Sequence, residues 1–149
     1  LKRVKRISST NKSGPFVGSE FAFEDFTSTE LNKYDYKFIC EDEFDGMKVD
    51  VVERFPRYEN SGYVRQIALV DQDVYQVRKI DFYDRKNSLL KTLTLKDYRE
   101  YEGGVWRAHA LEMVNHQTGK STTLTYGDYS FKTGLHDNDF VKGVLKRIR

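Results

Sequence analysis

The sequence lacks the features that define several common classes of protein. Cys40 is the only cysteine among 149 residues, so no disulfide can form within the chain. Its apolar stretches fall well short of the roughly 20 residues that a membrane-spanning helix needs, and no signal-peptide pattern is present in this chain. We therefore expect no transmembrane segment.

The sequence also lacks an excess of charge of one sign. Its 25 Lys and Arg residues are nearly balanced by 23 Asp and Glu residues, which gives a net charge of +2 at pH 7. A nucleic-acid-binding surface requires a strongly basic face, so nucleic acid is not an expected partner. Basic residues cluster near both ends of the chain, where solvated termini are the simpler interpretation.

No catalytic or metal-binding motif is evident. The three histidines, His109, His116 and His136, do not have the spacing of metal ligands, and none lies near Cys40 in the sequence. The acidic residues at 41–45 lack the DxDxDG pattern of a calcium loop. No GxSxG motif is present, and the glycines do not form a phosphate-binding loop. We therefore expect neither an enzyme nor a bound metal or cofactor.

The sequence does contain a series of segments typical of β-strands. Between residues 80 and 131, four segments rich in Leu, Thr, Val, Tyr and Trp are separated by the turn-forming groups DRKN, EGG and HQTG. Upstream, Asp45 and Gly46 form a hairpin signal between segments 34–41 and 47–55, and residues 63–70 follow. This pattern predicts an antiparallel meander of seven strands, and residues 2–9 predict a further strand.

Pairing these segments outward from their turns places apolar residues on one continuous face. In this register Leu93 lies opposite Met113. Leu95 lies opposite Leu111, which in turn pairs with Leu124. A sheet of this length twists and curls. We therefore expect a mainly β fold with short helices, in which a curved antiparallel half barrel carries this apolar stripe on its concave face.

Two regions outside the strands complete the predicted fold. Residues 21–31 predict one or two short helical turns. The tail predicts a C-terminal helix packed on the sheet edge, with Asp137 as N-cap and with Phe140, Val144 and Ile148 among its apolar residues. On its pattern alone, the stripe is equally well explained as ordinary core. Because these two regions are little material to cover seven strands, either a covering piece is missing or the face binds an apolar ligand.

Several motifs resemble those of one protein family. FYDR, LKTLTL, EMVNHQTGK and the closing GL..DF are similar to motifs of the LolA-like outer membrane lipoprotein-sorting proteins, and a weaker likeness extends upstream through GPFVGSEFAFEDF, YDYKF and VVER. The resemblance implies a single LolA-like domain over residues 1–149 that lacks an N-terminal portion. In this family a curved antiparallel sheet, lidded by helices, encloses an apolar cavity for acyl chains.

The resemblance also implies a function. It indicates a carrier in the periplasm of a Gram-negative bacterium, which moves lipid or lipoprotein acyl chains toward the outer membrane and works with a membrane transporter of the resistance-nodulation-division (RND) type. No cofactor is implied. Together with the apolar stripe, it predicts a lipid-binding cavity lined by twelve side chains: Phe38, Val49, Val51, Ile67, Leu69, Ile80, Phe82, Leu93, Leu95, Leu111, Met113 and Leu124.

Two alternatives remain open. In the first, the chain is a non-catalytic interaction module that docks on an envelope transporter, and the apolar stripe is ordinary core. In the second, a small-molecule enzyme uses His109 and Asp97, which face each other in the predicted register, as acid and base. A Leu111→Glu substitution separates the first alternative from a carrier, because it should unfold a core but should only weaken lipid binding at a cavity wall.

Overall fold

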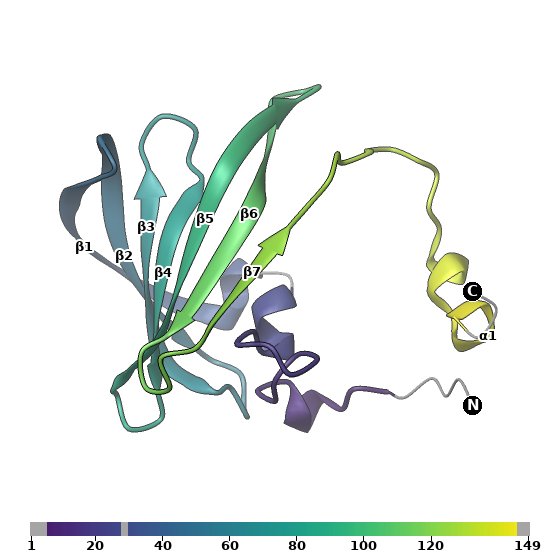
Figure 1. Cartoon of the computed structure of the whole chain (residues 1–149), viewed down its shortest axis with the longest axis horizontal. Coiled ribbons are helices and arrows are strands. Elements are labelled where there is room, and N and C mark those ends of the chain that lie inside the picture. Colours follow the sequence, from purple (N-terminus) through teal and green to yellow (C-terminus); the bar gives the residue numbers. More distant parts are fainter. Residues whose placement is uncertain (1–5, 28–29, 146–149) are drawn as a thin grey trace.

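Seven β-strands form one antiparallel sheet in which each strand pairs with the next along the chain. The computed structural model describes residues 6–27 and 30–145. The strands are β1 (Tyr34–Phe44), β2 (Met47–Pro56), β3 (Tyr63–Asp71), β4 (Val77–Asp84), β5 (Leu89–Tyr101), β6 (Val105–Asn115) and β7 (Ser121–Thr125). Figure 1 shows that the sheet twists and curves without closing on itself. The predicted meander is confirmed.

The register at two of the predicted turn regions is confirmed. Asp45 and Gly46 connect β1 to β2 with φ values of 51° and 76°, the positive values that a two-residue hairpin turn requires. In the second half of the sheet, Leu93 pairs with Met113. The predicted pairs of Leu111 with a residue on each neighbouring strand are also present.

A β-bulge at Arg78 changes which side chains of β3 and β4 share a face. Leu69 pairs with Lys79, whereas the next residue, Val70, pairs with Val77, so Arg78 is an extra residue in β4. Because side chains alternate between the two faces of a strand, one extra residue moves the side chains beyond it to the other face. The predicted continuation of the stripe from β3 into β4 is therefore wrong.

A second bulge has the same effect on β1. Phe38 pairs with Val52, whereas Cys40 pairs with Val51, which leaves Ile39 as the extra residue. The expected face shared by Phe38, Cys40 and Val51 is thus divided, and only Cys40 and Val51 remain together.

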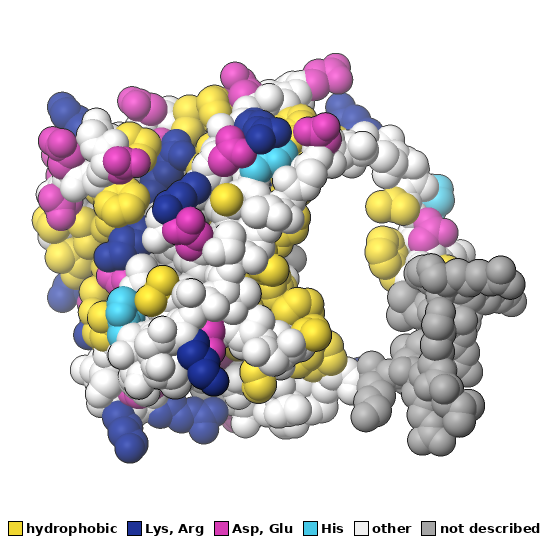
Figure 2. All heavy atoms as spheres, viewed as in Figure 1, with side chains coloured by type: hydrophobic (Ala, Val, Ile, Leu, Met, Phe, Trp, Pro, Cys, Tyr) yellow, Lys and Arg dark blue, Asp and Glu magenta, His cyan; other side chains and the backbone are white. Residues whose placement is uncertain are grey.

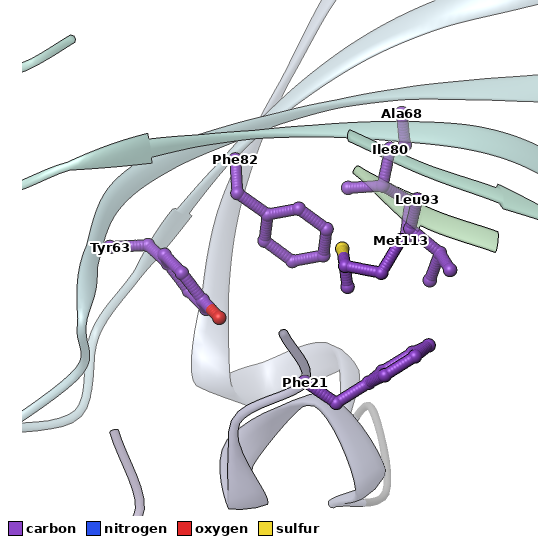
Figure 3. Close-up of a cluster of buried hydrophobic side chains, with 7 residues drawn as sticks. All are labelled: Phe21, Tyr63, Ala68, Ile80, Phe82, Leu93 and Met113. Atoms are coloured by element: carbon purple, nitrogen blue, oxygen red, sulfur yellow. The ribbon is translucent and has the colours of Figure 1, made fainter. Parts of the chain in front are cut away.

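The N-terminal segment, residues 12–27, lies against one face of the sheet (Figure 1). We call the face that carries Ile80, Leu93 and Met113 and that contacts this segment the inner face. Phe21 lies opposite Leu93 and Met113 in Figure 3 and is only 1% exposed. The central core therefore forms between this segment and the inner face. It consists of Phe21, Tyr63, Ala68, Ile80, Phe82, Leu93 and Met113.

A helical turn at 23–26 agrees with the prediction for residues 21–31, and another at 31–33 begins at the last residue of that range, whereas the turn at 9–11 was not predicted and the predicted first strand is not formed in its described residues. The turns are η1 (Ser9–Asn11), η2 (Phe23–Phe26) and η3 (Leu31–Lys33), all of the 3₁₀ type. Residues 6–8, in the described part of the strand predicted at 2–9, have no regular structure, and residues 1–5 lie outside the described part of the chain.

The C-terminal segment differs from the predicted helix packed on the sheet edge. It consists of η4 (Asp137–Phe140) and α1 (Lys142–Leu145), and Figure 1 shows both away from the sheet. Phe140 is 63% exposed, and His136, not Asp137, is the N-cap of η4. The prediction is wrong because residues 126–131 still contact β5 and β6, and residues 132–136, which form no helix or strand, then carry the chain away from the sheet. Ile148 lies outside the described residues.

Within residues 6–27 and 30–145, no helix is long and apolar enough to cross a membrane.

Candidate functional site

Neighbouring strands place apolar side chains in two rows on the inner face. The register brings residues of β3 to β6 into the first row, which consists of Ala68, Ile80, Leu93 and Met113. The second row crosses β5 to β7 and consists of Leu95, Leu111 and Leu124. The N-terminal segment covers Met113 completely, whereas the residues of the second row are half-buried. The second row therefore keeps apolar surface accessible.

A pocket of about 230 Å³ lies between the inner face and the N-terminal segment. Its floor is apolar and includes Ile80, Leu93, Leu95 and Leu111. Its remaining wall is polar and includes Asp25, Glu24, Tyr34, Arg54, Tyr58 and Gln66. Because pockets for drug-sized ligands usually measure about 300–1,000 Å³, this pocket has room for only part of a long acyl chain.

Apolar surface also lies outside the pocket, and half-buried Leu124 continues it from the floor residue Leu111. In Figure 2, hydrophobic side chains gather along the edge of the molecular body that faces the C-terminal segment. Exposed apolar residues in the part of the chain that follows β7 include Tyr126 and Phe131. An apolar chain longer than the pocket therefore has further apolar surface to contact.

The structure brings seven of the twelve predicted cavity residues together on the inner face. These are Ile80, Phe82, Leu93, Leu95, Leu111, Met113 and Leu124. Phe38 belongs to the same face through its pairing with Val52, but it is 60% exposed on an edge strand and does not line the pocket.

The other four predicted residues lie on the opposite face. Val51 pairs with Leu69, and Leu69 pairs with Lys79. Each of these residues is one position along its strand from a residue of the inner-face row Val52–Ala68–Ile80, so it points to the opposite face. Ile67 pairs with Asp81, and Val49 alternates in step with Val51. The predicted grouping of Val49, Val51, Ile67 and Leu69 with the pocket residues is therefore incorrect, because the Arg78 bulge reverses the faces.

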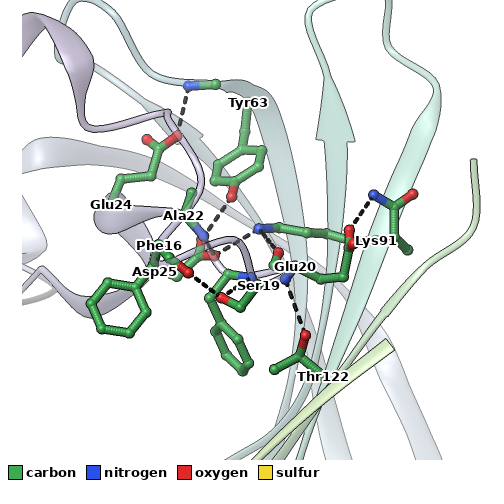
Figure 4. Close-up of polar contacts among 12 residues, drawn as sticks. Phe16, Ser19, Glu20, Ala22, Glu24, Asp25, Tyr63, Lys91 and Thr122 are labelled. Atoms are coloured by element: carbon green, nitrogen blue, oxygen red, sulfur yellow. Dashed lines mark hydrogen bonds and ion pairs between the residues drawn. The ribbon is translucent and has the colours of Figure 1, made fainter. Parts of the chain in front are cut away.

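A buried ion pair joins the N-terminal segment to β5. Lys91 Nζ lies 2.7 Å from Asp25 Oδ2, and it also donates to the Glu20 carbonyl oxygen at 3.0 Å (Figure 4). The Tyr63 hydroxyl and the Ala22 amide both donate to Asp25 at 2.7 Å. Burial and the nearby Asp25 charge raise the pKa of Tyr63 far above its ordinary value, so the hydroxyl stays protonated and remains a donor.

A second buried carboxylate fixes the same segment at the start of β3. Glu24 accepts hydrogen bonds from the Gly62 amide at 2.8 Å, the Ser61 hydroxyl at 3.1 Å and the Tyr58 hydroxyl at 3.2 Å. A Cβ atom on Gly62 would lie only 2.8 Å from Glu24 Oε1, so a larger residue at this position would displace the Glu24 carboxylate from the contact. Glu20 provides a third attachment, because its carboxylate accepts from Asn115 Nδ2 at 2.7 Å and its amide donates to Thr122 Oγ1 at 3.1 Å. The N-terminal segment is thus attached by polar contacts of Asp25, Glu24 and Glu20.

This attachment was not predicted from the sequence, although one signal for it is present there. Lys91 has the same position in the alternation of β5 as Leu93 and Leu95, so it had to face inward with them. A buried lysine requires a partner of opposite charge. Nothing in the sequence indicates that this partner is Asp25, which precedes Lys91 by 66 residues.

Arg54 on β2 contributes a positive charge to the pocket wall. Its Nε donates to Gln66 Oε1 at 2.6 Å, and its guanidinium carbon lies 5.0 Å from the centre of the Tyr34 ring. Burial lowers the pKa of Arg54 from its ordinary value. Arginine nevertheless keeps its charge in proteins, so the pocket has a half-buried cation on its sheet side.

The proposed acid–base pair of the enzyme alternative is not formed. His109 is buried, and its Nε2 lies 2.7 Å from the Tyr101 hydroxyl while its Nδ1 lies 3.1 Å from the Tyr126 carbonyl oxygen. Asp97 is instead paired with Arg99 at 2.7 Å. His109 therefore attaches the chain after β7 to the sheet.

Comparison with known proteins identifies relatives of the chain. The model of a family described as "Uncharacterized protein" matches residues 1–147. No curated protein matches the sequence. Among solved structures, a Vibrio parahaemolyticus domain that is described as an outer membrane lipoprotein-sorting protein domain is 54% identical with a TM-score of 0.95, and the match covers 98% of this chain and 62% of that one.

Two further structures share the fold. A DUF1329 family protein from Desulfovibrio piger is 26% identical with a TM-score of 0.88, over 95% of this chain and 59% of that one. A LolA superfamily protein from Nitrosomonas europaea is 20% identical with a TM-score of 0.78, over 96% of this chain and 64% of that one, and shows the fold alone. The chain spans about six-tenths of the length of these three structures. The chain therefore belongs to the family whose model matches residues 1–147, and its structural neighbours are outer membrane lipoprotein-sorting, DUF1329 and LolA superfamily proteins.

Proposed function

We propose that the chain acts as a periplasmic carrier, which binds lipid or lipoprotein acyl chains on its inner face and moves them toward the outer membrane. The observation that carries the proposal is the pocket between the N-terminal segment and the inner face. Its apolar floor continues into the half-buried row of Leu95, Leu111 and Leu124. The lipoprotein-sorting description of the Vibrio domain supports the same function.

Such a carrier must bind its acyl chain without a chemical reaction. Burial of an acyl chain contributes roughly 0.8 kcal/mol per CH₂ group, offset by the cost of ordering the chain. The floor residues Ile80, Leu93 and Leu111 present no polar side-chain atom to the pocket, so affinity scales with the apolar area that the chain covers. Partial burial over the open row keeps the affinity moderate, which allows release to an acceptor.

The transport partner in this proposal is a membrane transporter of the RND type. The support for this partner is the family resemblance of the sequence. A carrier that exchanges cargo with a transporter must keep its binding face accessible, and the half-buried second row on β5 to β7 meets that requirement.

Native mass spectrometry with a matched pair of variants tests the carrier function. We expect the purified protein to retain or take up about one acyl-chain ligand. Leu111→Glu should weaken this uptake, because it places a charge on the pocket floor. Val114→Glu on the same strand should not, because Val114 is exposed and one residue out of step with the inner-face residue Met113.

The outcomes separate the two main functions. Loss of ligand in a folded Leu111→Glu protein supports the carrier, whereas unchanged uptake by that protein contradicts it. The docking module is favoured by a different observation, the exposed apolar residues Tyr36, Phe38 and Ile39 along edge strand β1. A wild-type protein that takes up no lipid, together with an unfolded Leu111→Glu variant, favours the docking function.

A further inference from the structure

We propose that Arg54 binds the anionic head group, a carboxylate or a phosphate, of an amphiphile whose acyl chain lies on the apolar floor of the pocket. This inference rests on the proposed carrier function and narrows its ligand. It assigns the head group to the sheet side of the pocket, next to Tyr34 and Gln66.

The register places the guanidinium at the border between polar and apolar parts of the inner face. Arg54 pairs with Gln66, and the neighbouring pair Val52–Ala68 belongs to the apolar row that continues through Ile80. Both Arg54 and Ile80 line the same pocket. A ligand with its charged end at Arg54 therefore has apolar floor directly beside it.

Some N–H donors of the Arg54 side chain make no hydrogen bond to the described part of the chain. An arginine side chain carries five N–H donors, and the Nε of Arg54 donates to Gln66. Its two Nη groups make no hydrogen bond to a described residue, and no carboxylate of a described residue forms an ion pair with it within 4.0 Å. The arginines on the next two strands differ, since Arg65 pairs with Glu53 at 3.0 Å and Arg78 with Asp71 at 2.6 Å.

The acidic side chains that face the pocket are engaged elsewhere. Asp25 is paired with Lys91, and Glu24 accepts hydrogen bonds from the loop before β3. Both acids come from the N-terminal segment, whereas Arg54 comes from the sheet. Asp25 attracts Arg54 across the pocket but forms no ion pair with it within 4.0 Å. A half-buried cation without an ion-pair partner is costly, and an anionic ligand would offset that cost. Two Nη groups match the two oxygens of a carboxylate or phosphate.

Calorimetric titration of the wild-type protein with three twelve-carbon ligands provides the test. Dodecanoate and dodecyl phosphate carry the two candidate head groups, and dodecanol is the neutral control with the same chain. We expect at least one anion to bind about tenfold or more tightly than dodecanol, because charge-assisted hydrogen bonds are the strong ones. The tighter of the two anions identifies the head group. The preference should shrink as sodium chloride is added.

Three variants assign this preference to Arg54. Arg54→Gln should abolish the preference for the anion and leave dodecanol binding within about twofold, while Arg54→Lys should retain part of it because the charge remains. Arg57→Gln is the matched control, since it removes an exposed arginine that follows β2 and does not line the pocket. It should keep the full preference.

The outcomes distinguish failure of this inference from failure of the carrier function. Equal binding of dodecanol and both anions by the wild type overturns the head-group site but leaves the carrier. A preference that survives Arg54→Gln also overturns it. Absence of binding by all three ligands overturns both proposals. If Arg54→Gln does not fold, the anion preferences of Arg54→Lys and Arg57→Gln are compared instead. If these two variants prefer the anions over dodecanol equally, and salt does not change that preference, the head-group site at Arg54 is overturned.

Discussion

Removal of the charge of Lys91 tests whether a buried ion pair attaches the N-terminal segment to the sheet. The Lys91 and Asp25 side chains are 4% and 2% exposed, and their charged atoms lie 2.7 Å apart. Lys91→Met keeps most of the side-chain length but leaves the Asp25 carboxylate without its cation. Removal of one partner from a buried pair costs about 3–5 kcal/mol. We expect the free energy of unfolding to fall by an amount in this range.

The remaining contacts of Asp25 place the expected loss near the lower limit. The Tyr63 hydroxyl and the Ala22 amide still donate to Asp25 in the variant, each at 2.7 Å in the wild type. A loss of about 3 kcal/mol, divided by a urea m-value of about 1–3 kcal/mol/M, lowers the midpoint of urea unfolding by about 1–3 M. Circular dichroism measures this midpoint. Hydrogen exchange of residues 20–27 should increase as well, because these residues lose their tie to β5.

A second lysine on the same strand provides the control. Lys96 pairs with Glu112 at 2.6 Å, but the two side chains are 51% and 42% exposed. Lys96→Met should therefore change the free energy of unfolding by less than about 1 kcal/mol. If the two variants shift the urea midpoint equally, the buried pair contributes no more than the exposed one, and the proposed attachment is refuted.

Two further predictions concern the core and the response to acid. Met113→Ala should lower the free energy of unfolding by about 2–5 kcal/mol, because Met113 is completely buried; thermal unfolding measures this, and a loss no larger than that of the exposed control Leu89→Ala contradicts it. Burial alone would raise the pKa of Asp71, but hydrogen bonds from the Val74 amide and the Arg78 guanidinium outweigh it and lower the pKa. Asp71 therefore stabilises the fold above its ordinary pKa, and this stability is lost as the pH falls through the lowered value. Asp71→Asn should flatten the acid limb of the stability profile in urea titrations, and an unchanged acid limb would show that the carboxylate is not responsible.

The sheet order could be predicted because turn residues and alternation are local features. Asp45 and Gly46 define one hairpin, and the turn signals around β6 fixed the pairs of Leu93 and Leu111. The face of β3 relative to β4 could not be predicted in this way. It depends on one residue, Arg78, whose side chain pairs with Asp71 and lies 4.3 Å from the centre of the Tyr98 ring. These are tertiary contacts, and alternation within a single strand does not reveal them.

The candidate site was likewise predictable only in part, since its apolar floor could be predicted and its polar wall could not. The floor of the pocket was found from alternation on β4 to β6, which explains why Ile80, Leu93 and Leu111 were identified correctly as neighbours on one face. The polar wall was missed, because Arg54 and Asp25 are ordinary charged residues in the sequence and only the fold brings them to one pocket. Long-range polar partners are set by chain topology, whereas apolar faces are set by local periodicity.

The attachment points of the N-terminal segment bear on how the proposed carrier would take up its ligand. Asp25 contacts Lys91, and Glu24 contacts Gly62, so both ties hold the segment at the end of the inner face where β3 begins. Buried polar contacts of this kind depend strongly on geometry, whereas an apolar surface accepts chains of different shape. The row that contains Leu111 lies beyond these ties and is half-buried. An acyl chain that enters along this row leaves both ties intact. Under the proposed function, uptake and release therefore need no rupture of the ion pair.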